Sequence, residues 1–153
     1  MSEELRRRIL LAKEKREKER IEQRLPDAIF QRFVDGSEIP GWAGEELARF
    51  CRTETRPDYS TAATSPQDLG GWIETLARDH QFPSTLLART GLENFPWLEC
   101  QCTSAGWAEA LRDVLGHDLT LLSEDKRRLL VVFEEEYENI AFVTSRESPS
   151  SAE

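Results

Sequence analysis

The sequence contains few of the residues and motifs from which catalytic sites and disulfide frameworks are built. Its 153 residues include only three cysteines, two histidines and one methionine. An odd number of cysteines does not make a disulfide framework, so a reducing, cytoplasmic environment is expected. The chain also lacks a nucleophile elbow, a glycine-rich phosphate loop and the spaced ligands of a calcium-binding loop. These absences favour a protein that is not an enzyme and has no cofactor.

Long hydrophobic runs are missing as well. No stretch approaches the roughly 20 apolar residues of a membrane span. The first residues show no apolar signal-peptide core and hold too many glutamates for an organelle transit peptide. Because 39% of the residues are hydrophobic and 32% are charged, a soluble single domain that does not associate with membranes is expected.

Charge is distributed unevenly along the chain. Residues 1–24 carry nine Lys and Arg against six Glu, a net charge of +3. Residues 25–153 carry eleven Lys and Arg against twenty-three Asp and Glu, a net charge of −12. A body this acidic repels nucleic-acid phosphates and attracts basic proteins. The expected partner is therefore a basic protein, such as a toxin or nuclease, and no direct nucleic-acid binding is expected.

Composition predicts three segments. Residues 1–24 contain no Gly or Pro and place opposite charges four residues apart, which predicts a charged helix that is solvated and packed at one end. Residues 25–145 are predicted to form a single globular domain. Residues 146–153 include a Ser-Pro-Ser-Ser run and predict a disordered tail.

The first half of the domain has apolar residues at helical spacing. Ser65 followed by Pro66 is the clearest helix start, with Ser65 as the N-cap. Gly70 and Gly71 inside that helix imply a close approach of another backbone. The predicted helices cover residues 28–34, 42–51, 66–80 and 83–89.

The second half of the domain is richer in strand patterns. Residues 98–103 alternate as a strand, and a helix is predicted at 107–115 after a cap at Thr103 or Ser104. Residues 52–64 are predicted to be an exposed connection. The whole pattern predicts an α+β fold, with a helical N-terminal half and a small, mostly antiparallel sheet of about four strands in the C-terminal half. The helices are expected on one face of that sheet.

The most informative stretch is residues 118–143. Its β-branched and aromatic residues, broken by polar clusters, predict three antiparallel strands joined by tight turns. Residues 129–133 are apolar throughout and are expected to form a central strand covered on both faces. A helical alternative exists because Leu129, Phe133 and Tyr137 are spaced by four. The β-branched content favours the strands.

An acidic cluster follows the central strand. It consists of Glu134, Glu135, Glu136 and Glu138, with Tyr137 among them. One interpretation is a solubilising rim beyond a hydrophobic strand. The other is a binding surface, on which charge steers a basic protein and the aromatic ring anchors it. Glu124 and Asp125, at the neighbouring turn, are predicted to extend this surface.

A different hypothesis uses the few reactive side chains. A small enzyme or metal protein would need the fold to bring together Cys51, Cys100, Cys102, His80 and His117. Cys100 and Cys102 are one residue apart in a predicted strand, whereas structural zinc uses thiolates two to four residues apart in a turn. Packing of the thiols in the core is therefore preferred, and no metal site is predicted.

The stretch from Leu121 to Asp125, the apolar strand after it and the acidic run to Glu138 together resemble the C-terminal hairpin of some small bacterial immunity proteins. The resemblance covers about twenty-five residues. Those proteins are cytosolic, usually acidic, and neutralise a cognate toxin by binding it. The resemblance implies a non-catalytic protein of the immunity or inhibitor type that neutralises or regulates a basic partner. A further alternative is an adaptor or structural protein that assembles through residues 1–24.

Overall fold

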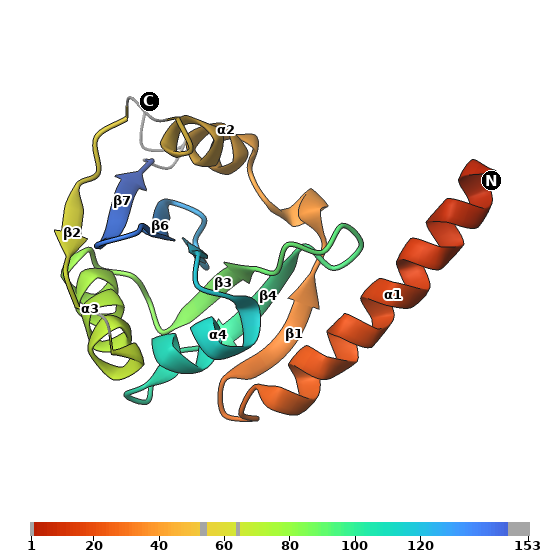
Figure 1. Cartoon of the computed structure of the whole chain (residues 1–153), viewed down its shortest axis with the longest axis horizontal. Helices are drawn as coiled ribbons and strands as arrows, with labels where there is room; N and C mark the ends of the chain where they lie inside the picture. The colour runs from red at the N-terminus through yellow and green to blue at the C-terminus, as the bar shows by residue number, and fades with distance from the viewer. Residues whose placement is uncertain (1, 53–54, 64, 147–153) are drawn as a thin grey trace.

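The structure, a computed structural model, describes residues 2–52, 55–63 and 65–146. The helices in these ranges are α1 Glu3–Arg24, α2 Gly41–Phe50, α3 Pro66–Asp79 and α4 Trp107–Leu115, with a short 3₁₀ helix, η1, at Gly36–Glu38. The strands are β1 Phe30–Val34, β2 Tyr59–Thr61, β3 Thr85–Arg89, β4 Trp97–Gln101, β5 Leu119–Ser123, β6 Arg128–Glu134 and β7 Asn139–Ser145. Figure 1 shows their arrangement.

All seven strands of the described chain belong to one sheet, in the order β1-β4-β3-β5-β6-β7-β2. Every pairing in it is antiparallel. The predicted meander at residues 118–143 is confirmed as β5, β6 and β7, with β6 between the other two. Both edge strands, β1 and β2, come from the N-terminal half of the chain.

The α+β class is confirmed, but two parts of the prediction are wrong. The sheet has seven strands in the described residues, not about four, and the helices are not confined to the N-terminal half because α4 lies among the later strands. Two segments predicted as helices, 28–34 and 83–89, form β1 and β3. Residues 59–61, expected in an exposed connection, form β2 and pair with β7.

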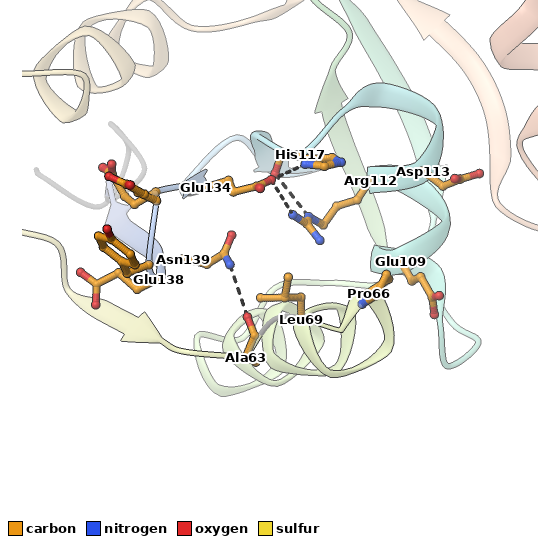
Figure 2. Close-up of a pocket in the computed structure, with 13 residues that line it drawn as sticks. Ala63, Pro66, Leu69, Glu109, Arg112, Asp113, His117, Glu134, Glu138 and Asn139 are labelled. Carbon is orange, nitrogen blue, oxygen red and sulfur yellow. Dashed lines mark hydrogen bonds and ion pairs between the residues drawn. The ribbon is translucent and has the colours of Figure 1, made fainter.

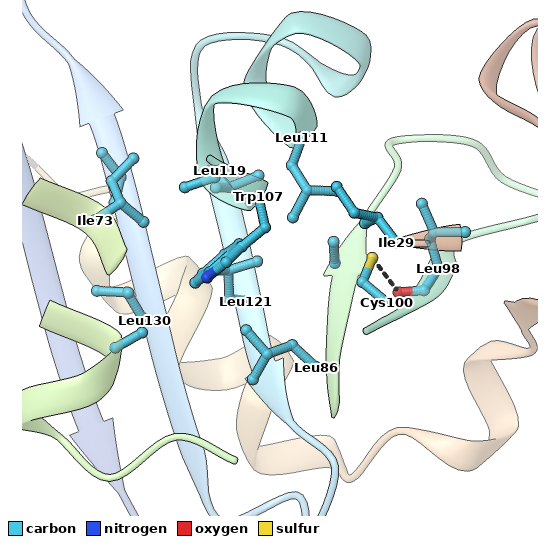
Figure 3. Close-up of a cluster of buried hydrophobic side chains, with 14 of the residues drawn as sticks. Ile29, Ile73, Leu86, Leu98, Cys100, Trp107, Leu111, Leu119, Leu121 and Leu130 are labelled. Atoms are coloured by element: carbon cyan, nitrogen blue, oxygen red, sulfur yellow. Dashed lines mark hydrogen bonds between the residues drawn. The ribbon is translucent and has the colours of Figure 1, made fainter. Parts of the chain in front are cut away.

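The sheet separates two hydrophobic clusters, because side chains alternate between its faces. Leu130 and Val132 of β6 pack in the cluster beneath α3 and α4. Leu129 and Val131 of the same strand pack in the other cluster, with Phe50 of α2. Figure 3 shows the first cluster, in which Trp107 lies over β5. Helices therefore cover both faces, and the expectation that they lie on one face is wrong.

α1 runs along the side of the domain and is packed at its C-terminal end (Figure 1). Ile21 and Leu25 are buried in the core, whereas Leu5 and Ile9 are about half exposed, at 45% and 51%. No helix in the described ranges combines the length and the apolar character that crossing a bilayer requires. The tail predicted at 146–153 lies, apart from Arg146, outside the described residues.

Local helix signals are confirmed at α3. Ser65 Oγ accepts a hydrogen bond of 3.0 Å from the backbone N–H of Asp68, and Pro66 is the first helical residue. The close approach expected at Gly70 is also present, since a Cβ there would lie 3.0 Å from the backbone nitrogen of Glu109 in α4. At Gly71 a Cβ would meet nothing within 4 Å, so no close approach explains that glycine. The cap of α4 is Gly106, with φ of 93°, rather than Thr103 or Ser104.

Candidate functional site

The acidic cluster forms the turn between β6 and β7, which we call the acidic tip (Glu134–Glu138). Glu134 is the last residue of β6 and pairs in register with Asn139, the first residue of β7. The turn is closed by a hydrogen bond of 2.8 Å from the backbone N–H of Glu135 to the carbonyl oxygen of Glu138. All five side chains are exposed, and the exposed fraction of Tyr137 is 84%. Because the strand ends at Glu134, the carboxylates after it lie on a turn and do not alternate between the two faces of the sheet.

The acidic tip forms one wall of a cavity of about 520 Å³. Figure 2 shows the opposite walls, which α4 and the start of α3 provide. The residues that line the cavity are Ala63, Pro66, Leu69, Glu109, Arg112, Asp113, His117, Glu134, Glu135, Glu136, Tyr137, Glu138 and Asn139. Six carboxylates and one guanidinium give this lining a formal charge of −5 with His117 neutral. The cavity therefore attracts cations and repels anions.

Arg112 and Glu134 hold the inner side of the cavity together. Arg112 is buried, and its Nε donates a hydrogen bond of 3.3 Å to the backbone carbonyl of His117. Its Nη2 lies 3.7 Å from Glu134 Oε2, which also contacts His117 Nδ1. The backbone N–H of Glu134 donates to Asp118 Oδ1 at 2.9 Å. Glu134 is thus engaged with the protein itself.

The other three carboxylates of the acidic tip differ from Glu134 in their ion pairing. Within the described residues, no ion pair involves Glu135, Glu136 or Glu138. On the opposite wall, Asp113 pairs with Arg24 of α1 at 3.3 Å. Three exposed charges at the mouth of the cavity are therefore available to a ligand.

Asn139 has a buried polar atom in the cavity wall that the described residues do not hydrogen-bond. Its side chain is buried, with the residue only 6% exposed, and its Nδ2 is 3.5 Å from the carbonyl oxygen of Ala63. Because that carbonyl can only accept, the amide nitrogen must face it, and Oδ1 points the other way (Figure 2). Oδ1 has no donor within the described part of the chain. A buried acceptor left without a donor costs about 1–3 kcal/mol.

Glu124 and Asp125 lie elsewhere. They form the turn between β5 and β6, at the opposite end of β6 from the acidic tip, which at about 3.3 Å per residue is roughly 20 Å away. Asp125 accepts hydrogen bonds from Ser123 Oγ at 2.6 Å and from the backbone N–H of Arg127 at 3.1 Å, which stabilise that turn. The structure does not bring these two residues to the surface that was predicted from the other five.

The reactive side chains of the enzyme or metal hypothesis are dispersed. His80 hydrogen-bonds to the hydroxyl of Tyr59 at 2.8 Å, whereas His117 contacts Glu134. Cys51 is exposed, and Cys100 is buried in the core. No three His, Cys, Asp or Glu side chains in the described ranges are placed to hold a metal ion.

Burial also makes two of the thiols poor nucleophiles. Burial raises the pKa of Cys100 well above its usual value, with smaller contributions from Cys102 and Glu99. Burial, with the nearby charge of Glu74, raises the pKa of Cys102 to about 12. Because the thiolate is the reactive species, both thiols are protected at neutral pH.

Sequence patterns found the acidic tip but not the residues that complete the cavity. These patterns predicted the helix that carries Glu109, Arg112 and Asp113 and the strand that begins at Asn139, but they indicated no role for these four residues. Their meeting depends on the packing of α4 beside the end of β6, which no local pattern encodes. The one available signal was Gly70, whose missing side chain lets α3 approach α4 closely at Glu109.

Together the fold and the cavity define a seven-stranded antiparallel α+β structure with an acidic cavity at one end of its sheet, within the residues described. No protein-family model, curated protein or solved structure matches the chain.

Proposed function

We propose that this protein is a non-catalytic, acidic binding protein that neutralises or regulates a basic protein partner, and that the acidic tip and its cavity are the contact surface. The observation that carries the proposal is the cavity lining, which holds six carboxylates against one guanidinium. Three of those carboxylates lie on an exposed turn without ion pairs to other described residues. The resemblance of the C-terminal hairpin to bacterial immunity proteins supports the inhibitor type.

The composition of the acidic tip suits protein recognition. Charges of one sign speed the encounter with an oppositely charged partner and disfavour wrong partners. Tyr137 offers a large rigid ring at 84% exposure between Glu136 and Glu138, and tyrosine is enriched among residues that carry binding energy. A tight turn at the end of two paired strands presents both features with little loss of conformational entropy.

The enzyme or metal alternative is less favoured because its residues are dispersed. His117, His80, Cys102 and Cys51 each line a different hollow of the surface. The adaptor alternative would use the exposed half of α1. Leu5 and Ile9 are the large apolar side chains exposed there, and two such residues do not make the sustained apolar seam that a coiled coil needs.

The test compares three immobilised proteins in lysate of the cells that express the chain. They are the wild type, a tip variant and a control variant. The tip variant carries Glu135→Gln, Glu136→Gln and Glu138→Gln. The control variant carries Glu3→Gln, Glu4→Gln and Glu19→Gln, which remove the same charge from exposed positions of α1.

The expected result is a basic protein that the wild type and the control variant retain at low salt and release with increasing salt, and that the tip variant does not retain. The partner, once purified, should associate with the tip variant at least tenfold more slowly than with the wild type at low ionic strength, because charge steering acts mainly on the association rate. Its own activity should fall in proportion to the wild-type protein bound. Equal retention by all three proteins, or retention by none, would contradict the proposal.

A further inference from the structure

We infer that the cavity behind the acidic tip receives a single arginine side chain of the basic partner, whose guanidinium donates to Asn139 Oδ1 and pairs with the carboxylates of the tip. This inference rests on the proposed function and specifies which chemical group of the partner the site recognises. It is carried by Asn139, a residue separate from the acidic cluster.

Asn139 requires a ligand that donates hydrogen bonds. Its Oδ1 is buried in the cavity wall without a donor, whereas its Nδ2 already faces the carbonyl of Ala63. That bond, at 3.5 Å, is at the limit of hydrogen-bond length. An incoming donor reaches Oδ1 when the amide turns, and the bond to Ala63 that this turn gives up is a long one. A phosphate or a carboxylate, which can only accept, cannot satisfy it.

The charge of the lining restricts the donor to a cation. At a formal charge of −5, the cavity disfavours any anion, and a neutral donor gains less from the six carboxylates than a cation does, because it lacks the charge–charge attraction. Glu136 and Glu138 are exposed and line the cavity on either side of Tyr137 in the chain, so they are available to pair with a cation that enters there.

The wall formed by the start of α3 is apolar. Ala63, Pro66 and Leu69 line it, and Leu69 is buried beneath the surface. A long side chain with an aliphatic stem can lay its methylene groups on such a wall while its charged end reaches the polar groups beyond. A metal ion or a free ammonium ion has no aliphatic stem to pack on that wall, whereas arginine and lysine both have one.

Arginine fits better than lysine for two reasons. Its planar guanidinium has five N–H donors in a fixed fork, so it can reach Asn139 Oδ1 and a carboxylate at the same time. It also stacks on aromatic rings, and the exposed ring of Tyr137 stands at the mouth of the cavity. A lysine ammonium is a compact, strongly hydrated charge that gains less from either feature.

Arg112 weakens this binding but does not prevent it, because Glu134 compensates part of its charge. Its guanidinium lies against Glu134 and the carbonyl of His117, on the α4 side of the cavity (Figure 2). The carboxylates that remain, at Glu135, Glu136 and Glu138, belong to the turn that Asn139 directly follows in the chain. Arg112 thus closes the inner end and leaves the outer carboxylates to the ligand.

The experiment measures the binding of three blocked tripeptides to the ¹⁵N-labelled full chain by NMR titration. The probes are acetyl-Gly-Arg-Gly-amide, its lysine counterpart and its citrulline counterpart, which keeps the shape of arginine without the charge. The arginine probe should shift the side-chain amide signal of Asn139 and the backbone signals of Tyr137 and Leu69. The lysine probe should bind about threefold to tenfold more weakly, the range of one net hydrogen bond, and the citrulline probe should not bind measurably.

Two variants at position 139 complete the test. Asn139→Ala, which removes the acceptor, should weaken arginine binding about threefold to tenfold, and Asn139→Asp, which adds a charged acceptor, should strengthen it. Equal binding of the arginine and lysine probes, unchanged binding by both variants, or no shift at Asn139 because water alone fills the cavity would overturn the inference. If the tip variant fails to capture the partner but Asn139→Ala still captures it, the proposed function stands and the inference about arginine fails.

Discussion

Glu14 and Asn94, 80 residues apart in the chain, are joined by two hydrogen bonds of 2.8 Å that end on the same carboxylate oxygen of Glu14. One comes from the backbone N–H of Asn94 and the other from its side-chain amide. The second oxygen of Glu14 accepts from the backbone N–H of Glu93 at 2.7 Å. A buried carboxylate of α1 thus satisfies three donors of the loop between β3 and β4, and it fixes the helix to the sheet.

Glu14→Ala should therefore destabilise the protein. It leaves three donors of a partly buried loop without their acceptor, which predicts a loss of about 1–3 kcal/mol in the free energy of unfolding. The matched control is Glu19→Ala, an exposed position of the same helix, which should stay within about 0.5 kcal/mol of the wild type. Urea denaturation followed by circular dichroism measures both. Equal effects at the two positions would mean that the loop contact adds nothing.

The stabilisation by Glu14 should also depend on pH. Burial alone raises the pKa of Glu14, but the hydrogen bonds from Asn94 and Glu93, with the charge of Lys13, outweigh it and lower the pKa. A lowered folded-state pKa means that the contribution is complete above the ordinary glutamate value of about 4.3 and is lost as pH falls through the folded-state pKa. The stability difference between the wild type and Glu14→Gln should be constant near neutral pH and shrink below about pH 4. A difference that grew in acid would contradict this sign.

Gly70 and Gly71 make a second matched pair. A Cβ at Gly70 would lie 3.0 Å from both the backbone nitrogen and the Cβ of Glu109, whereas a Cβ at Gly71 would meet nothing within 4 Å. Gly70→Ala should cost about 1–3 kcal/mol by forcing α3 and α4 apart. Gly71→Ala should instead gain about 0.5–1 kcal/mol from helix propensity. Thermal unfolding of the two variants checks the opposite signs.

The three cysteines should differ sharply in reactivity. Cys51 is exposed, Cys100 is buried, and burial raises the pKa of Cys102 to about 12. At pH 8 the thiolate fraction of a thiol with that pKa is on the order of 10⁻⁴. A colorimetric thiol reagent should label one cysteine in the native protein, at the rate of a small free thiol, and all three after denaturation. A native thiol that reacts much faster than glutathione would instead favour the enzyme alternative.

Arg112→Met should tighten the binding of the arginine tripeptide. The change removes the one guanidinium among the residues that line the cavity and keeps a similar aliphatic stem. One partly screened charge near a bound cation is worth roughly 1 kcal/mol, which predicts an affinity about fivefold higher. Arg112→Lys, which keeps the charge, should leave the affinity within about twofold. NMR titration measures all three proteins. A weaker affinity in an Arg112→Met protein whose spectrum without peptide matches that of the wild type would place the peptide away from this cavity.

Local chemistry predicted the parts of the fold whose causes are local. The cap at Ser65, the buried run of β6 and the turns of the C-terminal meander follow from residue types within a few positions of one another. The segments that form β1 and β3 were predicted as helices because the cause of their strand conformation is not local. Residues 28–34 carry apolar side chains at helical spacing, and residues 83–89 are rich in Leu and Ala. Pairing with β4, and for β3 also with β5, makes them strands. The acidic tip was visible in the sequence, whereas its cavity needed α3 and α4 in place.

The pairing of β2 has a consequence for synthesis on the ribosome. Within the described residues, the only strand that pairs with Tyr59, Ser60 and Thr61 is β7, at Ala141, Ile140 and Asn139. Some eighty residues must therefore be translated before this segment finds its partner. The edge strand β1 likewise cannot pair until β4 has been translated. A nascent chain halted before β7 holds β2 unpaired, so chaperones that bind extended chains should associate with such stalled chains and leave them once β7 emerges.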